Sequence, residues 1–298
     1  MRRVFRSVAT IGLLTLGLAG GASGQSGSDC RPEGGLAKLE GLPEASGLAI
    51  SRRSPGRLWA HNDSGEPVIF AVSASGAVSR VRLTGVAVDD WEAIAVGDCP
   101  GGSCVYIGDI GDNNGRRKQI TVYRLAEPAG GDGSVQVKDI FHATYPDGAH
   151  DAETLLVSPD GTLYIVTKGE TGGVSLYRFP KELRPGATHK LERVGKPRDS
   201  NKVAEDRRIT DGTLSADGKW VALRSKTRVW IYPASEFLSG SWSGAREIDV
   251  TSLGEPQGEG IAMSADGTIY LAGEGGGKSQ PGTLARLSCG KIASKPSH

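Results

Sequence analysis

The chain has 298 residues, of which 44 are Gly and 6% are aromatic. Lys and Arg together number 35, and Asp and Glu together number 34, so no basic excess points to a nucleic-acid polymer as a partner. Frequent glycines between short apolar runs are typical of short strands joined by tight turns, and this length allows one large domain or two small ones.

The N-terminus has the order of a secretory signal peptide. Three arginines in the first six residues precede the apolar run "VATIGLLTLGLAG", which "GASGQ" follows. The small residues Ala22 and Gly24 predict cleavage after Gly24, so we expect residues 1–24 to be a signal peptide and the product to be secreted or extracytoplasmic. No later apolar stretch is long enough to cross a bilayer, so we expect no membrane insertion.

Five segments of the remaining chain resemble one another, at a spacing of roughly 50 residues that is typical of propeller blades. They read "EASGLAISRRSPG", "DWEAIAVGDCPGG", "HDAETLLVSPDG", "RITDGTLSADG" and "QGEGIAMSADG". A second and a third extended run follow each segment, and a weaker fourth run follows all but the last, such as "VQVKDIFHATY" in the second repeat and "HKLERVG" in the third. A spare strand, Gly35–Leu42, precedes the first segment and can complete the last blade. The pattern predicts a single all-β domain over residues 25–298, a five-bladed β-propeller closed by this N-terminal strand.

All four cysteines lie beyond the predicted cleavage site, and an even count in an exported protein favours disulfides. Ring closure would bring Cys30 close to Cys289, and Cys99 and Cys104 flank one turn, so we predict these two pairs. Free thiols or a zinc site are the alternatives, but a four-cysteine zinc site usually needs two short spacings and only "CPGGSC" is short.

One polar position recurs in all five segments, four residues before the last apolar residue. Its members are Ser46, Glu92, Glu153, Thr210 and Glu259. The first strand of each blade lines the channel, so this column would converge on the axis, where three carboxylates repel unless a positive charge neutralises them. An all-oxygen set of three carboxylates and two hydroxyls suits Ca²⁺ better than Mg²⁺. The alternatives are a water-filled channel, or glutamates that cap strand ends by accepting backbone N–H bonds.

The column resembles the central calcium site of the calcium-activated nucleotidases (apyrases), five-bladed propellers whose inner strands present Ser, Glu, Glu, Ser and Glu. The segments "GEGIAMS" and "DWEAIAV" are similar to inner strands of that family, and "WVALRS" is similar to the second strand of its fourth blade. The resemblance covers strand rhythm and five positions but not the connecting loops, so it implies the fold and the ion, and nucleotide hydrolysis only weakly. The strings "HNDSG", "DDWEAIAV" and "YIGDIGDNNGRR" also resemble secreted bacterial propellers of uncharacterised function.

Polar side chains concentrate in the loops that enter the first strands and leave the second strands, which share one face, whereas the opposite face has plain turns such as "SADG". Propeller sites usually lie over the channel mouth, where blades converge. We therefore expect chemistry from Asp63, Asp90 and Asp112, and binding of an anionic group by Arg116, Arg224 and His150. The alternatives are that Asp112 only forms a tight turn in "GDIGDNNGRR", that Arg116 is merely solvated, and that His150 is a surface residue.

Two classes of function remain. The first is an exported Ca²⁺-dependent hydrolase for a small anionic substrate, such as a phosphoester or a nucleotide, with a glycosidase that uses paired carboxylates as a variant. The second is a non-catalytic propeller that binds an extracellular protein, a glycan or an envelope component and carries a structural ion. No nucleophile elbow, P-loop or H-E-x-x-H pattern is present. We expect a monomer in either case.

Overall fold

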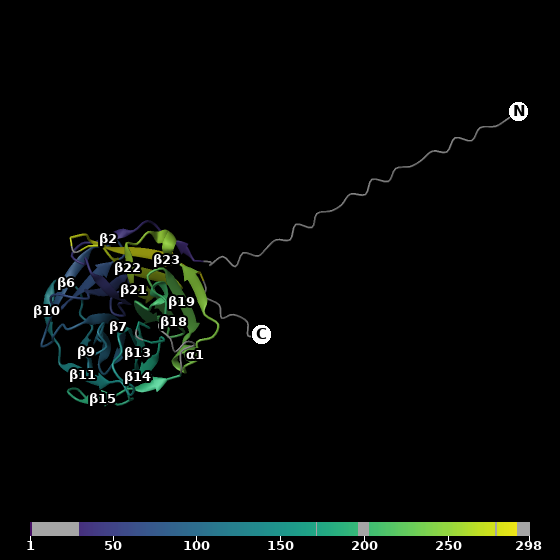
Figure 1. The fold of residues 1–298 in the computed structure, drawn as a ribbon. Helices are drawn as coiled ribbons and strands as arrows, with labels where there is room; N and C mark the ends of the chain where they lie inside the picture. The colour runs from purple at the N-terminus through teal and green to yellow at the C-terminus, as the bar shows by residue number, and fades with distance from the viewer. Residues whose placement is uncertain (2–29, 171, 196–202, 278, 291–298) are drawn as a thin grey trace.

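The computed structural model describes residues 1, 30–170, 172–195, 203–277 and 279–290, so the predicted signal peptide and its cleavage site lie outside the described part. Five mainly antiparallel sheets surround a central axis as the blades of a β-propeller, which confirms the predicted fold class (Figure 1). The chain colour runs around the ring, so that the last blade, in yellow, lies beside the first, in purple.

The first two blades consist of four antiparallel strands, with a further strand added in parallel at the outer edge. Blade one contains β3 (Ala45–Ile50), β4 (Arg57–Asn62), β5 (Val68–Ser73) and β6 (Val78–Thr84), with β10 (Gly133–Gln136) beside β6. Blade two contains β7 (Trp91–Cys99), β8 (Gly102–Asp109), β9 (Ile120–Ala126) and β11 (Asp139–Thr144), with β15 (Thr188–Lys190) beside β11.

The other three blades are antiparallel throughout. Blade three contains β12 (Ala152–Val157), β13 (Leu163–Thr167), β14 (Leu176–Arg178) and β16 (Glu192–Val194). Blade four contains β17 (Asp211–Leu214), β18 (Trp220–Arg224), β19 (Arg228–Pro233) and β20 (Arg246–Asp249). Blade five is built on β21 (Gln257–Met263), β22 (Thr268–Glu274) and β23 (Gly282–Ser288). The helical segments of the described chain are η1 (Glu205–Arg207), α1 (Ala234–Leu238) and η2 (Thr251–Leu253).

The N-terminal segment closes the ring, as predicted. Two short strands, β1 (Arg31–Pro32) and β2 (Ala37–Leu39), pair antiparallel with β23 at the outer side of blade five. Figure 1 shows β2 and β23 side by side at the top of the ring. Leu39 and Leu42 are fully buried in the apolar cluster between blades five and one, so the closing segment contributes to the core as well as to the sheet.

Both predicted disulfides are present. Cys30 is bonded to Cys289, which joins the start of the closing segment to the end of blade five, and Cys99 is bonded to Cys104 across the β7–β8 hairpin. Two disulfides indicate an oxidising, extracytoplasmic environment. Among the described residues, no helix is long and apolar enough to cross a membrane.

The outer strands differ from the prediction. The run "VQVKDIFHATY", expected as one fourth strand of blade two, is divided between β10, which pairs with β6 of blade one, and β11, which pairs with β9. The run "HKLERVG" is divided in the same way between β15 and β16. The physical reason is that a fourth strand leaves one row of N–H and C=O groups unpaired, and the next stretch of chain satisfies these groups.

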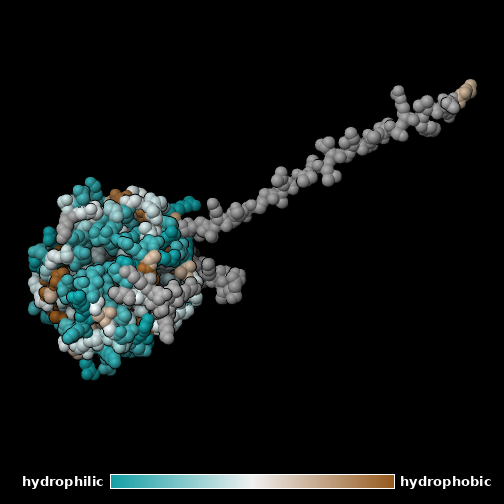
Figure 2. Space-filling view, viewed as in Figure 1, coloured by the Kyte–Doolittle hydropathy of each residue, from teal (hydrophilic) through white to brown (hydrophobic). Residues whose placement is uncertain are grey.

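Five apolar clusters form the core, each between two neighbouring blades. Trp59 and Trp91, for example, are fully buried between blades one and two. Because the apolar faces of each blade are used against its neighbours, the strand ends and loops around the axis are left to carry polar side chains. Figure 2 shows that the face turned to the viewer is mostly hydrophilic, with hydrophobic residues scattered over it.

Candidate functional site around the channel axis

The polar column predicted from the sequence coincides with β-bulges in four of the five blades. At Ser46, Glu92, Glu153 and Glu259, the inner strand contains one residue more than the second strand with which it pairs. The fifth member, Thr210, directly precedes β17, which pairs without such a shift over its described length. A bulge redirects the side chain that it carries, so a carboxylate can leave the blade in a strand that is otherwise buried.

The three glutamates of the column lie close enough to repel one another. All three are buried, and Glu92 lies within hydrogen-bond reach of the Glu153 carboxyl group. Burial, followed by repulsion from Glu153, raises the pKa of Glu92 well above its usual range, and the same two causes raise the pKa of Glu259 to about 8. The mutual repulsion expected from the sequence is therefore present.

Lys168, which follows β13, brings a positive charge to this group. Its Nζ atom forms an ion pair with Glu153 and lies 3.5 Å from Oδ2 of Asp151. Burial acts to lower the pKa of Lys168, but the two carboxylates outweigh it and the pKa is raised. Neither Lys168 nor Asp151 was linked to the column from the sequence, although Asp151 directly precedes the inner strand that carries Glu153 and Lys168 directly follows the strand that pairs with it.

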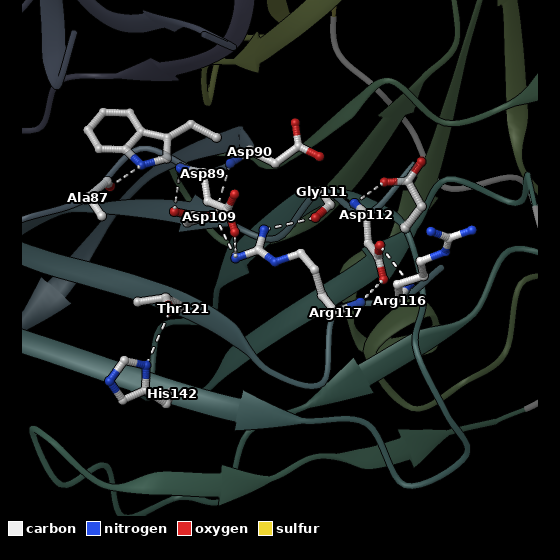
Figure 3. Close-up of polar contacts among 12 residues, drawn as sticks. Ala87, Asp89, Asp90, Asp109, Gly111, Asp112, Arg116, Arg117, Thr121 and His142 are labelled. Atoms are coloured by element: carbon white, nitrogen blue, oxygen red, sulfur yellow. Dashed lines mark hydrogen bonds and ion pairs between the residues drawn. The ribbon is translucent and has the colours of Figure 1, made fainter. Parts of the chain in front are cut away.

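A second polar network holds the loop that enters blade two (Figure 3). Asp109, at the end of β8, accepts the backbone N–H groups of Asp89 and Asp90, both at 3.2 Å, and forms a 2.7 Å ion pair with Arg117. Arg117 also donates to the carbonyl oxygen of Gly111 at 2.8 Å. The Asp90 carboxylate points out of this network and has no hydrogen-bond partner among the residues drawn in Figure 3. Burial, followed by the charge of nearby Asp151, raises its pKa.

Asp112 organises the turn between β8 and β9. Its two carboxylate oxygens accept the backbone N–H groups of Arg116 at 2.9 Å and Arg117 at 2.8 Å, and its carbonyl oxygen accepts the N–H group of Gly115. The structure thus shows Asp112 holding a tight turn, which was the alternative to a part in chemistry. Its predicted part in chemistry stays a prediction, and Arg116, predicted to hold an anionic group, is exposed at the same turn.

Asp63 lies in a different acidic group, between blades one and five. Burial, followed by repulsion from Glu44, raises the pKa of Asp63, and burial followed by Asp63 raises that of Glu274. The charges that act most strongly on Asp90 are instead those of blades two and three. The parts predicted for Asp63 and Asp90 in chemistry stay predictions.

Arg224 does not face the channel mouth, contrary to its predicted role. Its side chain is fully buried, donates to the carbonyl oxygens of Gly260 at 2.7 Å and Ala272 at 2.8 Å, and forms an ion pair with Glu255. Because its contacts lie between the two blades and its charge is paired with Glu255, this guanidinium group is not available to an anionic substrate at the channel mouth. It instead joins blade four to blade five.

We expect Arg224→Met to lower the free energy of unfolding by about 3 kcal/mol or more, because it leaves the Glu255 carboxylate buried without its partner. Urea unfolding of both proteins measures the difference. Arg228→Met is the matched control, since Arg228 forms ion pairs on the partly exposed outer strands and should cost about 1 kcal/mol or less. Equal losses in the two variants would contradict the buried position of Arg224.

Sequence reasoning missed Asp211, which follows Thr210 in the chain. It is buried, and its carboxylate accepts three backbone N–H groups, from Gly212 at 2.7 Å, Ile261 at 2.8 Å and Leu48 at 3.3 Å. Two of these donors directly follow the bulges of blades five and one, so Asp211 fixes the inner strands of three blades near the axis. A carboxylate beside a column position, in an otherwise apolar strand, was the available signal.

Among the described residues, no three His, Cys, Asp or Glu side chains are grouped so that they could hold a metal ion as they stand. The donor set nevertheless suits Ca²⁺, because oxygen ligands come from all five blades and the acidic groups outnumber their cations. Among the described residues, Glu92 has the Glu153 carboxyl group as its hydrogen-bonding neighbour, and Oδ2 of Asp151 is buried without a hydrogen-bond donor. Calcium at the column stays a prediction.

No protein family model and no curated protein matches this chain. Among solved structures, the chain is similar to the PQQ-bound aldose sugar dehydrogenase of Streptomyces coelicolor, with 14% identity over 87% of this chain and 97% of that one, and a TM-score of 0.49. A gluconolactonase from Xanthomonas campestris has 15% identity, 82% and 72% coverage and a TM-score of 0.44. Regucalcin of Agrobacterium tumefaciens, a calcium-binding protein, has 18% identity, 81% and 72% coverage and a TM-score of 0.45.

These similarities are too distant to assign the chain to a family. None of the three proteins is described as a calcium-activated nucleotidase, so that resemblance rests on the polar column and the quoted strand segments. The chain is a five-bladed propeller with three buried glutamates at bulges of its inner strands.

Proposed function

We propose that this protein is a secreted, calcium-dependent hydrolase that acts on a small anionic substrate, such as a phosphoester, at the mouth of the propeller channel. The observation that carries this proposal is that Glu92, Glu153 and Glu259 are buried at bulges of three inner strands, with Glu153 close enough to raise the pKa of the other two. Buried like charges of this kind are unfavourable without a counter-ion, and Lys168 supplies a single positive charge.

The column of Ser46, Glu92, Glu153, Thr210 and Glu259 would hold the ion. A bound Ca²⁺ ion supplies Lewis acidity and neutralises charge on a phosphoryl oxygen. Asp90 lies close enough to the column residue Glu92 to raise its pKa, and its carboxylate, which bonds to none of the residues drawn in Figure 3, would accept a proton from the attacking water. Lys168 lies next to Glu153, where its ammonium group can stabilise negative charge that develops on the substrate. Arg116, exposed at the rim, can attract an anion by its charge.

We expect Asp90→Asn to reduce the rate of hydrolysis at least about a hundredfold, because it removes the proton acceptor at nearly constant size. The purified protein is first assayed against phosphomonoesters, phosphodiesters and nucleotides, each with calcium and with chelator. Asp89→Asn is the matched control: its carboxylate is largely exposed, 3.5 Å from Arg117, and its loss should change the rate little. Hydrolysis that is unaffected by Asp90→Asn would refute the assigned role.

A non-catalytic propeller with a structural ion is the second candidate, and the commitment of Asp109, Asp112 and Arg117 to loop bonds favours it. Calcium binding without turnover of any tested ester would support this alternative. The glycosidase variant would need two carboxyl groups that flank the substrate about 5 Å or more apart, and no contact among the described residues favours it over a phosphoester hydrolase. For both remaining candidates we propose a monomer, with a small anionic substrate for the hydrolase and an extracellular ligand for the non-catalytic propeller.

A further inference from the structure

Blade three contains a pocket beside the acidic column. Its volume is about 220 Å³. The lining residues are His150, Asp151, Thr167, Gly169, Gly172, Gly173, Ser175 and Arg193. Asp151 belongs both to this pocket and to the group around Lys168, so the pocket adjoins the candidate ion site. Three glycines in the wall leave the backbone accessible to a small ligand.

Two nitrogen-bearing side chains on the pocket are held in place by the same carboxylate. Arg193, in β16, lies 3.2 Å from Asp147 through Nη1 and donates to Oγ of Ser175 at 3.0 Å through Nη2. Nε2 of His150 lies 3.0 Å from Asp147 and 2.9 Å from the Tyr177 hydroxyl group. Because these bonds fix the Arg193 and His150 side chains, the rim is organised before any ligand binds.

The buried wall of the pocket carries an unsatisfied acceptor. The Asp151 side chain is 1% exposed, and its Oδ1 atom accepts the N–H group of Asp112 at 2.8 Å. Its Oδ2 atom has no hydrogen-bond donor among the described residues, and Lys168 Nζ is 3.5 Å away. A buried oxygen without a donor is costly, so a ligand that offers a hydrogen-bond donor here would be favoured.

The two cations beside the pocket, Arg193 and Lys168, are already paired with carboxylates. Arg193 is paired with Asp147, and Lys168 is paired with Asp151 and Glu153. An anion would be attracted by Arg193 but repelled by the Asp151 oxygen, whereas a cation would be attracted by Asp151 but repelled by Arg193. A hydroxyl group satisfies both sides, because it donates to a carboxylate and accepts from a guanidinium.

We propose that this pocket binds a neutral polyhydroxyl group of monosaccharide size, with hydroxyls that donate to Asp151 and accept from Arg193. The volume of about 220 Å³ is below that of pockets for drug-sized ligands. One further step rests on the proposed hydrolase function. If that function holds, the polyhydroxyl group is the alcohol part of the ester, and the anionic part of the same ester lies at the column.

The test is binding of neutral hexoses, pentoses and inositol, measured by calorimetry and by saturation-transfer NMR in the presence of chelator. At least one of these compounds should bind the wild-type protein, and Arg193→Gln should weaken its affinity about tenfold or more. Arg178→Gln is the matched control, since Arg178 pairs with Glu192 on the same outer strands and does not line the pocket. The Arg178→Gln variant should bind the compound with the same affinity as the wild-type protein.

A second variant keeps the charges and fills the space. An added Cβ at Gly172 meets no atom within 4 Å, so Gly172→Val should fold and obstruct the pocket, whereas Gly133→Val places the same side chain on exposed β10. Binding should be lost only in Gly172→Val. Absence of binding by every compound, preference for inorganic phosphate, or binding that survives both pocket variants would overturn the proposal. The binding measurements are made in chelator and therefore without bound calcium. Their outcome does not depend on whether the proposed hydrolase function is correct.

Discussion

Calcium is expected to stabilise the native protein by about 4 kcal/mol when its concentration exceeds the dissociation constant a thousandfold, because an ion that binds only the folded state acts by mass action. Chelator should remove this stabilisation and lower Tm. Glu259→Gln should reduce the difference sharply, since it keeps the size of the side chain and removes one of the three negative charges of the column. Thermal unfolding with calcium and with chelator measures the effect.

Glu92→Gln and Glu153→Gln should reduce the calcium-dependent difference in the same way. Glu247→Gln is the control, because Glu247 lies on outer strand β20, where it bonds to Arg228 and Trp230, and its variant should respond to calcium as the wild type does. If Tm does not respond to chelator, and elemental analysis finds no calcium in protein never exposed to chelator, the column is only a polar channel.

The arrangement of the blades could be predicted because its signals are local. Apolar residues that alternate within short runs, and turns that recur in the same position of each repeat, mark the strands without reference to distant residues. The closing strand and both disulfides followed from counting: the last repeat lacks a strand, and Cys30 and Cys289 stand at the two ends that must meet. The division of the outer strands could not be predicted in this way, because it depends on which neighbouring blade has a free edge.

Side-chain directions at the ends of strands could not be predicted, and two cations show the reason. Arg224 ends β18 opposite Asp211, the residue that follows column position Thr210, and the corresponding pair of blade three is Val166 opposite Thr154. Lys168 lies two residues beyond Val166, after the end of β13, and contacts the column residue Glu153 there, whereas Arg224 is still within its strand and lies between two blades. Both sequences read only as a basic residue after an apolar run.

The column itself was visible as a repeated position, but the bulges that direct it were not. A bulge adds one residue to the inner strand relative to its partner, and the partner strand carries no corresponding mark. The glycines that follow Ser46 and Glu259 are the nearest signal, because a Cβ at Gly260 would lie 2.6 Å from the carbonyl oxygen of Ser46. Two adjacent inner strands therefore approach each other at the position where both carry a column residue.

Removal of the Cys30–Cys289 disulfide is expected to lower the free energy of unfolding by about 5 kcal/mol. The two cysteines are 259 residues apart, so their bond constrains nearly the whole unfolded chain, and in the chain-entropy model the stabilisation grows with the length of the closed loop. The double variant Cys30→Ser with Cys289→Ser is compared with the wild type by urea unfolding without reductant.

The second disulfide provides the control for this measurement. Cys99 and Cys104 are only 5 residues apart, so the same pair of serine substitutions should cost about 2 kcal/mol. Equal losses would show that the long closure adds no constraint of its own. A loss confined largely to Cys30 and Cys289 would show that the ring is held shut where β1 and β2 meet β23, because that seam joins the two ends of the propeller. The acidic column depends on this closure, since Ser46 and Glu259 lie on the two blades that meet there.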